Sequence, residues 1–327
     1  MSLPSFQLLR PKTLDEAVSL LSMHSDQVKV VAGGTDLLPS MKQKLFTPPY
    51  VLDLRGISEL HGIQTNADGG VTVGSLTTLA AIEHSPLVRR DYAVLYQATK
   101  TVASPVLRNM GTLGGNICLD TRCLWYNQSL LWRKSCGFCL KKDGDLCHVA
   151  PGGKTCWAAF SGDTAPALLC LGAEVEIVSV DGMRRVPLAD FYVNDGIVRL
   201  HLSSQEIVVR VYLPEATKGW RGSYQKLRVR GSIDYPLAGV AVALKMRQGR
   251  VEDARMAVTA VNPAPHLIKD ADSLLVGAEV GEELAEKVGE LAARTAKPLT
   301  TSALTPEYRR EMVRVFAKRA LLESAAN

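Results

Sequence analysis

The sequence predicts an α+β protein in which two small α/β units precede a C-terminal domain of antiparallel strands and helices. Strand and helix patterns alternate over roughly the first two thirds of the chain. A hairpin pattern then appears, and three helical patterns close the chain. At 327 residues, the chain is long enough for two or three domains. We expect these domains to cover residues 1–56, 57–217 and 218–327.

The first unit is expected to begin with a helix. Thr13 and Glu16 have the spacing of a capping box, and apolar residues follow at helical spacing. A short apolar strand at residues 28–32 ends in Gly33-Gly34, where a second helix is expected to start. Another strand is expected at residues 50–54. The order strand, helix, strand is typical of an α/β unit.

The second unit is expected to start with a strand at residues 71–74, after an Asp-Gly-Gly turn. Two helices are predicted next, at residues 75–83 and 87–103. A glycine-rich stretch and a cysteine-rich insertion at about residues 118–160 interrupt the pattern. Beyond the insertion we expect a helix, a hairpin with an Asp-Gly turn, and a strong strand, at residues 163–171, 174–186 and 207–213.

The C-terminal domain is expected to be strands followed by helices. From Tyr224 onward the chain is predicted to form strands, with a turn at residues 248–250 joining the two longest, 237–246 and 251–261. Three helices are then predicted, at residues 264–276, 281–296 and 306–325.

Composition limits the classes of function. Hydrophobic residues make up 46% and charged residues 22%, the balance of a soluble globular protein. The net charge of +5 is spread along the chain, and no basic helix with interleaved aromatic residues predicts a nucleic-acid partner. No apolar run approaches the length of about 18 residues that a membrane span needs. The N-terminus lacks a signal-peptide pattern, so we expect a cytoplasmic protein.

Two glycine-rich loops are candidate phosphate-binding segments. They are Ala32-Gly33-Gly34-Thr35-Asp36 and Thr112-Leu113-Gly114-Gly115-Asn116. Without Cβ atoms, paired glycines let backbone N–H groups approach an anion closely. A Gly-Gly pair is more often a tight turn, and neither loop matches the G-x-G-x-x-G or P-loop patterns, which disfavours a standard NAD site. Two such loops in consecutive units could instead hold the two phosphates of a dinucleotide.

The cysteines are concentrated in the insertion. Of seven in the chain, five lie in one short segment: Cys123, Cys136, Cys139, Cys147 and Cys156. In a chain without an export signal, clustered cysteines indicate metal ligands rather than disulfides. Four thiolates suit either zinc or an iron–sulfur cluster. Zinc ribbons favour two C-x₂-C pairs and this chain has one, so zinc is less favoured but stays open. Spacing alone does not select four ligands from five.

Taken in order along the chain, these motifs resemble those of the FAD subunits of the xanthine oxidase and carbon monoxide dehydrogenase family. The resemblance rests on the two glycine loops, on the segments 73–78 and 161–166, and on Lys226-Leu227-Arg228 and Tyr308-Arg309-Arg310. It implies that the first two units are FAD-binding subdomains of the PCMH type. The two loops would bind the FAD diphosphate through Ala32, Gly33, Gly34, Thr35, Asp36, Thr112, Gly114, Gly115 and Asn116.

Three further residues are implied to lie at the cofactor. Thr77 would contribute a hydroxyl, Asp163 would contact the ribityl or adenosine portion, and Lys226 would lie near the flavin. Without the resemblance, each of the three is equally plausible as an ordinary surface residue.

The cysteine-rich insertion resembles that of one subfamily, the 4-hydroxybenzoyl-CoA reductases, whose FAD subunit holds an extra [4Fe-4S] cluster. The implied ligands are Cys123, Cys139, Cys147 and Cys156, and Cys136 falls outside that pattern.

No nucleophile elbow, metalloprotease motif or acid–base pair predicts substrate chemistry on this chain, so no catalytic residue is assigned. The resemblance implies an electron-transfer subunit. Its partners would be a molybdopterin-binding large subunit and a [2Fe-2S] small subunit in a dimer of heterotrimers, with ferredoxin as electron donor. The reaction implied is the reductive dehydroxylation of 4-hydroxybenzoyl-CoA. Two alternatives remain: a related oxidoreductase acting on another aromatic or heterocyclic substrate, and a zinc-stabilised protein that binds a phosphate ligand.

Overall fold

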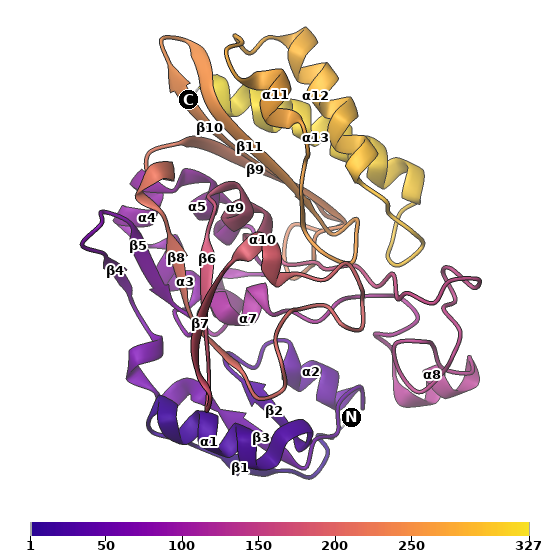
Figure 1. Cartoon of the computed structure of the whole chain (residues 1–327). Helices are drawn as coiled ribbons and strands as arrows, with labels where there is room; N and C mark the ends of the chain where they lie inside the picture. Colours follow the sequence, from indigo (N-terminus) through magenta and orange to yellow (C-terminus); the bar gives the residue numbers. More distant parts are fainter. Residues whose placement is uncertain (1, 327) are drawn as a thin grey trace.

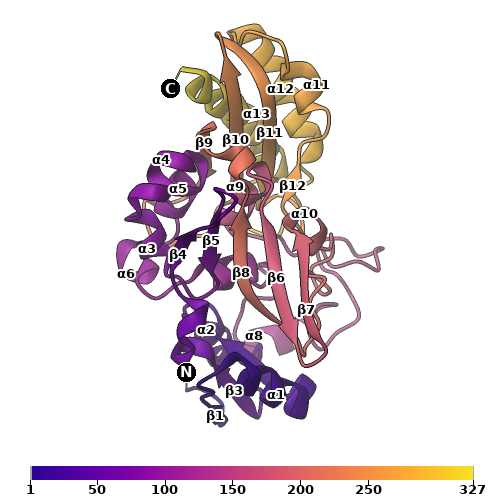
Figure 2. The same cartoon turned by 60° about the vertical axis from the view of Figure 1, so that its left-hand side comes forward.

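The computed structural model describes residues 2–326 and contains three β-sheets arranged one above another (Figure 1). The N-terminal sheet lies at the bottom of that view, a five-stranded sheet occupies the middle, and the C-terminal sheet lies at the top. Figure 2, turned by 60°, shows the same order. The α+β fold class predicted from the sequence is confirmed. The predicted domain boundaries at residues 56 and 217 stay predictions.

The N-terminal sheet has the strand order β1-β3-β2, and both of its strand pairs are parallel. As predicted, the side chain of Thr13 caps the first helix by accepting a hydrogen bond from the backbone N–H of Glu16. The elements are β1 (Gln7–Leu9), α1 (Leu14–His24), β2 (Val28–Val31), α2 (Leu37–Lys42) and β3 (Tyr50–Asp53). The first glycine loop therefore lies between β2 and α2, where the strand-helix-strand pattern predicted it.

The middle sheet has the order β4-β5-β8-β6-β7, and every pair in it is antiparallel. Its strands are β4 (Ile63–Thr65), β5 (Val71–Gly74), β6 (Glu174–Ser179), β7 (Gly182–Pro187) and β8 (Ile207–Leu213). Its helices are α3 (Leu79–Glu83), α4 (Pro86–Asp91), α5 (Ala93–Lys100), α6 (Pro105–Arg108), α7 (Leu113–Ile117), α8 (Leu130–Ser135), α9 (Thr164–Cys170) and α10 (Leu188–Phe191). Helix α8 belongs to the cysteine-rich insertion, which projects to the right in Figure 1.

The C-terminal sheet has the order β12-β11-β10-β9, all antiparallel. Helices α12 and α13 cover one face of it through a shared apolar core, while α5 and α9 pack on the other. Its elements are β9 (Arg221–Leu227), β10 (Ala238–Arg247), β11 (Arg250–Thr259), β12 (His266–Leu267), α11 (Ala271–Leu275), α12 (Glu282–Thr295) and α13 (Pro306–Ala326). This sheet is thus joined to the middle unit by packed helices.

Three predicted helices differ from those observed. The segment 87–103 forms two helices because Tyr92, whose ring is fully buried, has φ −137° and ψ 58°, outside the helical region. The helix predicted from residue 75 begins at Leu79, after a Thr78 cap. The helix predicted from residue 264 begins at Ala271, because His266 and Leu267 pair with β11 instead. In the third case, pairing with a distant strand outweighs the local helical pattern.

Along residues 2–326, no helix combines the length and apolar character that crossing a membrane requires.

Candidate functional site

A large cavity opens between the N-terminal sheet and the middle unit. Its volume is about 890 Å³, at the upper end of the range for small-molecule and cofactor sites. Both glycine loops line it, as does Tyr235 from the segment between β9 and β10. Ten of the twelve predicted cofactor residues reach its wall: Ala32, Gly33, Gly34, Thr35, Asp36, Thr112, Gly114, Gly115, Asn116 and Asp163.

The first glycine loop packs against Met110 and Gly111, which directly precede the second loop. A Cβ on Gly33 would overlap the carbonyl oxygen of Met110 and lie 2.7 Å from its carbonyl carbon. Beside this contact, the backbone N–H of Leu79 donates to the carbonyl of Gly111 over 2.8 Å. Gly33 is therefore required for packing between the loops, in addition to any role toward a ligand.

The second loop starts helix α7 and leaves part of its backbone open. The hydroxyl of Thr112 caps the helix by accepting a hydrogen bond from the N–H of Gly115 over 3.1 Å. Gly114 packs inward, because a Cβ there would lie 2.8 Å from Ser75. Gly115 is exposed on the cavity wall, and a Cβ there would meet only the Thr112 hydroxyl within 4 Å. A ligand can therefore approach the chain closely at Gly115. The N–H groups of residues 113–116 are already bonded within the protein.

Asp36 is the acidic residue of the first loop, and two groups hold its carboxylate. The Arg122 guanidinium forms an ion pair with it, and the Tyr235 hydroxyl donates to the same oxygen over 3.0 Å. Arg122 also lies over the Tyr235 ring, 4.2 Å from its centroid. This neutralises a negative charge that would otherwise repel a phosphate in the same loop. It also ties the cysteine-rich insertion to the first glycine loop.

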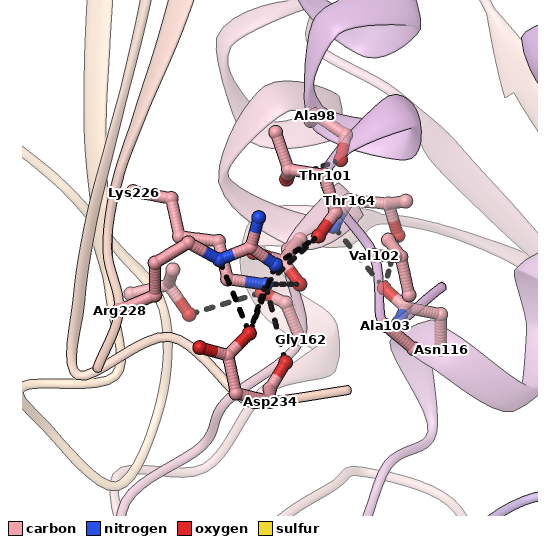
Figure 3. A network of polar contacts seen from close by, with 12 residues as sticks. Ala98, Thr101, Val102, Ala103, Asn116, Gly162, Thr164, Lys226, Arg228 and Asp234 are labelled. Atoms are coloured by element: carbon pink, nitrogen blue, oxygen red, sulfur yellow. Dashed lines mark hydrogen bonds and ion pairs between the residues drawn. The ribbon is translucent and has the colours of Figure 1, made fainter. Parts of the chain in front are cut away.

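The structure places two predicted residues away from the cavity wall. The hydroxyl of Thr77 is buried and is bonded to both the N–H and the carbonyl of Gly62 over 2.9 Å. Lys226 is also buried, and its ammonium donates to Asp163 over 3.1 Å. It also donates to the Thr101 carbonyl over 3.0 Å (Figure 3). The polar groups of both side chains are hydrogen-bonded within the protein, and neither residue lines the large cavity. Their positions therefore do not support direct contact with a cofactor.

Asp163 lies on the cavity wall, but its oxygens are also taken up by the protein. One accepts from the Tyr224 hydroxyl over 2.8 Å and the other from Lys226. Burial raises the pKa of Asp163, and the Lys226 charge opposes that rise. Close by, Arg228 donates to Asp234 over 2.8 Å, which holds the segment carrying Tyr235 beside the cavity (Figure 3). The ion pair of Asp163 with Lys226 therefore joins the cavity wall to strand β9.

The second cavity is small and lies within the cysteine-rich insertion. All four cysteines of the implied ligand set line it: Cys123, Cys139, Cys147 and Cys156. The other lining residues are mostly apolar or aromatic. Burial raises the pKa of the Cys123 and Cys156 thiols to about 11. Cys136 is absent from this wall and instead ends helix α8, half-buried.

Several residues at these cavities were not found from the sequence. Tyr126 and Lys141 line both cavities, and Asp120 lies between them, bonded to both side chains. Tyr126 and Lys141 stand inside the cysteine-rich pattern that carries the resemblance, but the sequence assigns them no role, because their contacts join segments up to about twenty residues apart. Within residues 2–326, His, Cys, Asp and Glu side chains form no group of three arranged to hold a metal ion.

Comparison with known proteins matches the whole chain to one family. Residues 4–216 match the FAD binding domain in molybdopterin dehydrogenase, and residues 222–324 match the CO dehydrogenase flavoprotein C-terminal domain. The chain is 30% identical to the nicotine 6-hydroxylase medium subunit of Paenarthrobacter nicotinovorans, covering 100% of this chain and 99% of that protein. It is 29% identical to the carbon monoxide dehydrogenase medium chain of Afipia carboxidovorans, covering 98% and 97%.

Solved structures of related enzymes have the same fold along the whole chain. A chain of reconstituted CO dehydrogenase from Oligotropha carboxidovorans superposes with a TM-score of 0.82 at 27% identity, covering 100% of this chain and 99% of the other. A chain of quinoline 2-oxidoreductase from Pseudomonas putida 86 gives 0.79 at 26% identity, again covering 100% and 99%.

Proposed function

The chain belongs to the family of FAD-binding subunits of molybdopterin dehydrogenases, and from this premise we propose that it serves a 4-hydroxybenzoyl-CoA reductase. In this proposal it carries electrons from reduced ferredoxin toward a molybdenum site, where the phenolic hydroxyl of the substrate is reductively removed. A [4Fe-4S] cluster would lie in the cysteine-lined cavity and FAD in the large one. The large and small subunits would complete a dimer of heterotrimers.

The large cavity suits FAD in size and in the groups it presents. Its volume of about 890 Å³ is sufficient for an extended dinucleotide, and the backbone at Gly115 is open to it. Gly34 and Thr35 of the first loop line the cavity. The ion pair with Arg122 offsets the negative charge of Asp36 in the same loop. When bound, FAD supplies one- or two-electron chemistry. The chain's own residues hold it in place and shield it.

The proposed [4Fe-4S] cluster, and with it the reductase subfamily, rests on one observation. The four implied ligands line a single buried cavity, and Cys136 lies outside it. Four buried thiols in apolar surroundings are a suitable donor set for an iron–sulfur cluster. Zinc stays less favoured than the cluster, because zinc ribbons favour two C-x₂-C pairs and this chain has one.

The buried thiols would have to lose their protons before they could bind iron. In the absence of a metal, burial keeps Cys123 and Cys156 protonated, with pKa values of about 11. Iron binding would displace those protons, so the thiols become thiolates only when the cluster is assembled. The four cysteine side chains are buried, which limits the access of water to the sulfurs.

A second candidate shares the family and differs in substrate. The relatives named above act, by their names, on nicotine and carbon monoxide. The substrate site would lie on another subunit, so this chain could equally serve an oxidoreductase for another aromatic or heterocyclic compound.

The deciding experiment is to quantify iron, acid-labile sulfide and flavin in the complex purified without oxygen, and then to supply reduced ferredoxin and 4-hydroxybenzoyl-CoA. We expect flavin, iron and sulfide beyond the amount that the [2Fe-2S] clusters of the small subunit supply, and formation of benzoyl-CoA. Iron and sulfide that the [2Fe-2S] clusters fully account for would remove the [4Fe-4S] cluster from the proposal. Both cofactors without benzoyl-CoA would favour the second candidate.

A further inference from the structure

The wall between the two cavities contains a buried lysine. Lys141 and Tyr126 line both the cysteine cavity and the large cavity. The Lys141 side chain is only 7% exposed, and its ammonium lies 4.6 Å from the centroid of the Tyr126 ring. Lys141 lies between Cys139 and Cys147 in the sequence, so the same loop carries the charge and two of the thiols.

The bonding pattern of Lys141 is that of a charged ammonium. It donates to Asp120 over 2.8 Å, to the carbonyl of Gly196 over 2.7 Å, and to the hydroxyl and carbonyl of Thr121. The Thr121 hydroxyl gives its own proton to Gly196, so it presents a lone pair to the lysine. Every neighbour of the Lys141 nitrogen is therefore an acceptor, which an ammonium with three donors satisfies.

The contact between Lys141 and Gly196 holds the positive charge of Lys141 near the sulfur of Cys156. Gly196 holds Lys141 through its carbonyl, and its N–H donates to the carbonyl of Cys156 over 2.8 Å. Gly196 also packs against the thiol, since a Cβ there would lie 2.7 Å from the Cys156 Sγ. Lys141 is thus anchored to the residue that touches the sulfur of a predicted ligand.

Asp120 positions Lys141 and balances its charge. The second oxygen of Asp120 accepts from the Tyr126 hydroxyl over 2.9 Å, and Arg199 lies 3.8 Å from the first. The buried junction therefore contains two cations and one carboxylate. Because it is shielded from solvent, salt screens its field less than that of a surface pair.

We propose that Lys141, positioned by Asp120, raises the reduction potential of the iron–sulfur cluster in the cysteine cavity. The inference rests on the proposed function, because it requires the cluster to be present. A cluster gains one negative charge with each electron, and a fixed positive charge beside it stabilises the reduced form. Lys141 acts through its charge and has no role in substrate chemistry.

The test is a redox titration of the iron–sulfur signal, followed by EPR, in the oxygen-free complex. In Lys141→Met we expect at least a tenfold less favourable reduction, which is a potential about 59 mV more negative for one electron. Asp120→Asn removes a negative charge and should shift the potential in the opposite direction. Lys141→Arg retains the charge and should stay near wild type.

The matched control is Lys142→Met, one residue away. Lys142 is 37% exposed, pairs with Asp143, and does not line the cysteine cavity, so its loss should leave the potential unchanged. If the Lys141→Met complex keeps its iron and has the wild-type potential, the role of Lys141 is overturned, but the proposed cluster is not. If Lys141→Met loses its iron, the reduction potential of the Asp120→Asn complex becomes the test. An unchanged potential in Asp120→Asn overturns the role of Lys141. A wild-type complex whose iron is fully accounted for by the [2Fe-2S] clusters overturns the proposed cluster, and this inference with it.

Discussion

Gly33 and Met110 pack directly against each other: the α-carbon of Gly33 faces the main-chain carbonyl of Met110, and no room remains for a side chain between them. These residues come from two glycine-rich segments more than seventy residues apart in the chain. Their contact brings both loops to one cavity wall. It also means that a glycine selected from the sequence as a phosphate-binding residue has a structural role.

Gly33→Ala should therefore destabilise the fold itself. The added methyl meets backbone atoms that cannot rotate away, and overpacking of this kind costs about 1–3 kcal/mol. Thermal unfolding of the flavin-free variant should show a lower midpoint than wild type. Gly152→Ala is the control, because a Cβ there meets nothing within 4 Å. Equal midpoints for the two variants would contradict the interlocked loops.

Gly115→Val should lose FAD while its flavin-free fold stays close to wild type. The side chain would extend from the exposed position on the second loop into the cavity, where it would occupy space that the bound cofactor needs. Flavin absorbance per chain after gel filtration measures the effect. Gly114→Val should differ by lowering the unfolding midpoint, because its side chain faces Ser75. Normal flavin content in Gly115→Val would count against this loop as the cradle.

Cys139→Ser should lose cluster iron, whereas Cys136→Ser should retain it. Cys139 lines the cysteine cavity, and Cys136 lies outside it, at the end of α8. The two positions are close in sequence, so the pair is a matched comparison. Iron and sulfide per chain in oxygen-free preparations give the answer. The choice of ligands is wrong if both variants lose the same amount.

Lys226→Met should destabilise the protein strongly. The side chains of Lys226 and Asp163 are 3% and 4% exposed, so removing the lysine leaves a buried carboxylate without its partner. Breaking a buried pair in this way costs about 3–5 kcal/mol. Urea unfolding should show that loss, with partial recovery in the double variant Asp163→Asn/Lys226→Met. Lys245→Met, which breaks a half-exposed pair with Glu252, should cost less than about 1 kcal/mol.

Glu206 should make stability depend on pH in the acid range. The hydrogen bond from Arg184 lowers the pKa of Glu206 below its ordinary value of 4.5. Its stabilisation, about 0.2–1 kcal/mol for such a pair, is then fully present above pH 4.5. It is lost as the pH falls through the lower folded-state pKa.

Unfolding midpoints of wild type and Glu206→Gln between pH 7 and pH 3 measure this dependence. The two curves should differ at neutral pH and converge on acidification. Asp190→Asn, which alters an exposed carboxylate on α10, should follow wild type throughout. A difference between wild type and Glu206→Gln that persists at pH 3 would argue against the Arg184 contact as the cause.

Local patterns in the sequence were sufficient for the fold class and for most helices and strands. The capping box at Thr13, the strand before Gly33 and the turn after Arg247 each depend on neighbours only a few residues away. The cysteine-rich insertion is similarly visible in the sequence, because five cysteines within one short segment stand out from the background composition.

The tertiary structure alone decided which side chains face the cavities. Thr77 and Lys226 belong to recognisable motifs, yet hydrogen bonds to Gly62 and to Asp163 turn both inward. Lys141 and Tyr126 lie within the cysteine-rich pattern and receive no role from it, yet both cavities meet at their side chains. The reason is physical: helix and strand periodicity is set by adjacent residues, whereas the surroundings of a side chain are set by distant segments that pack against it.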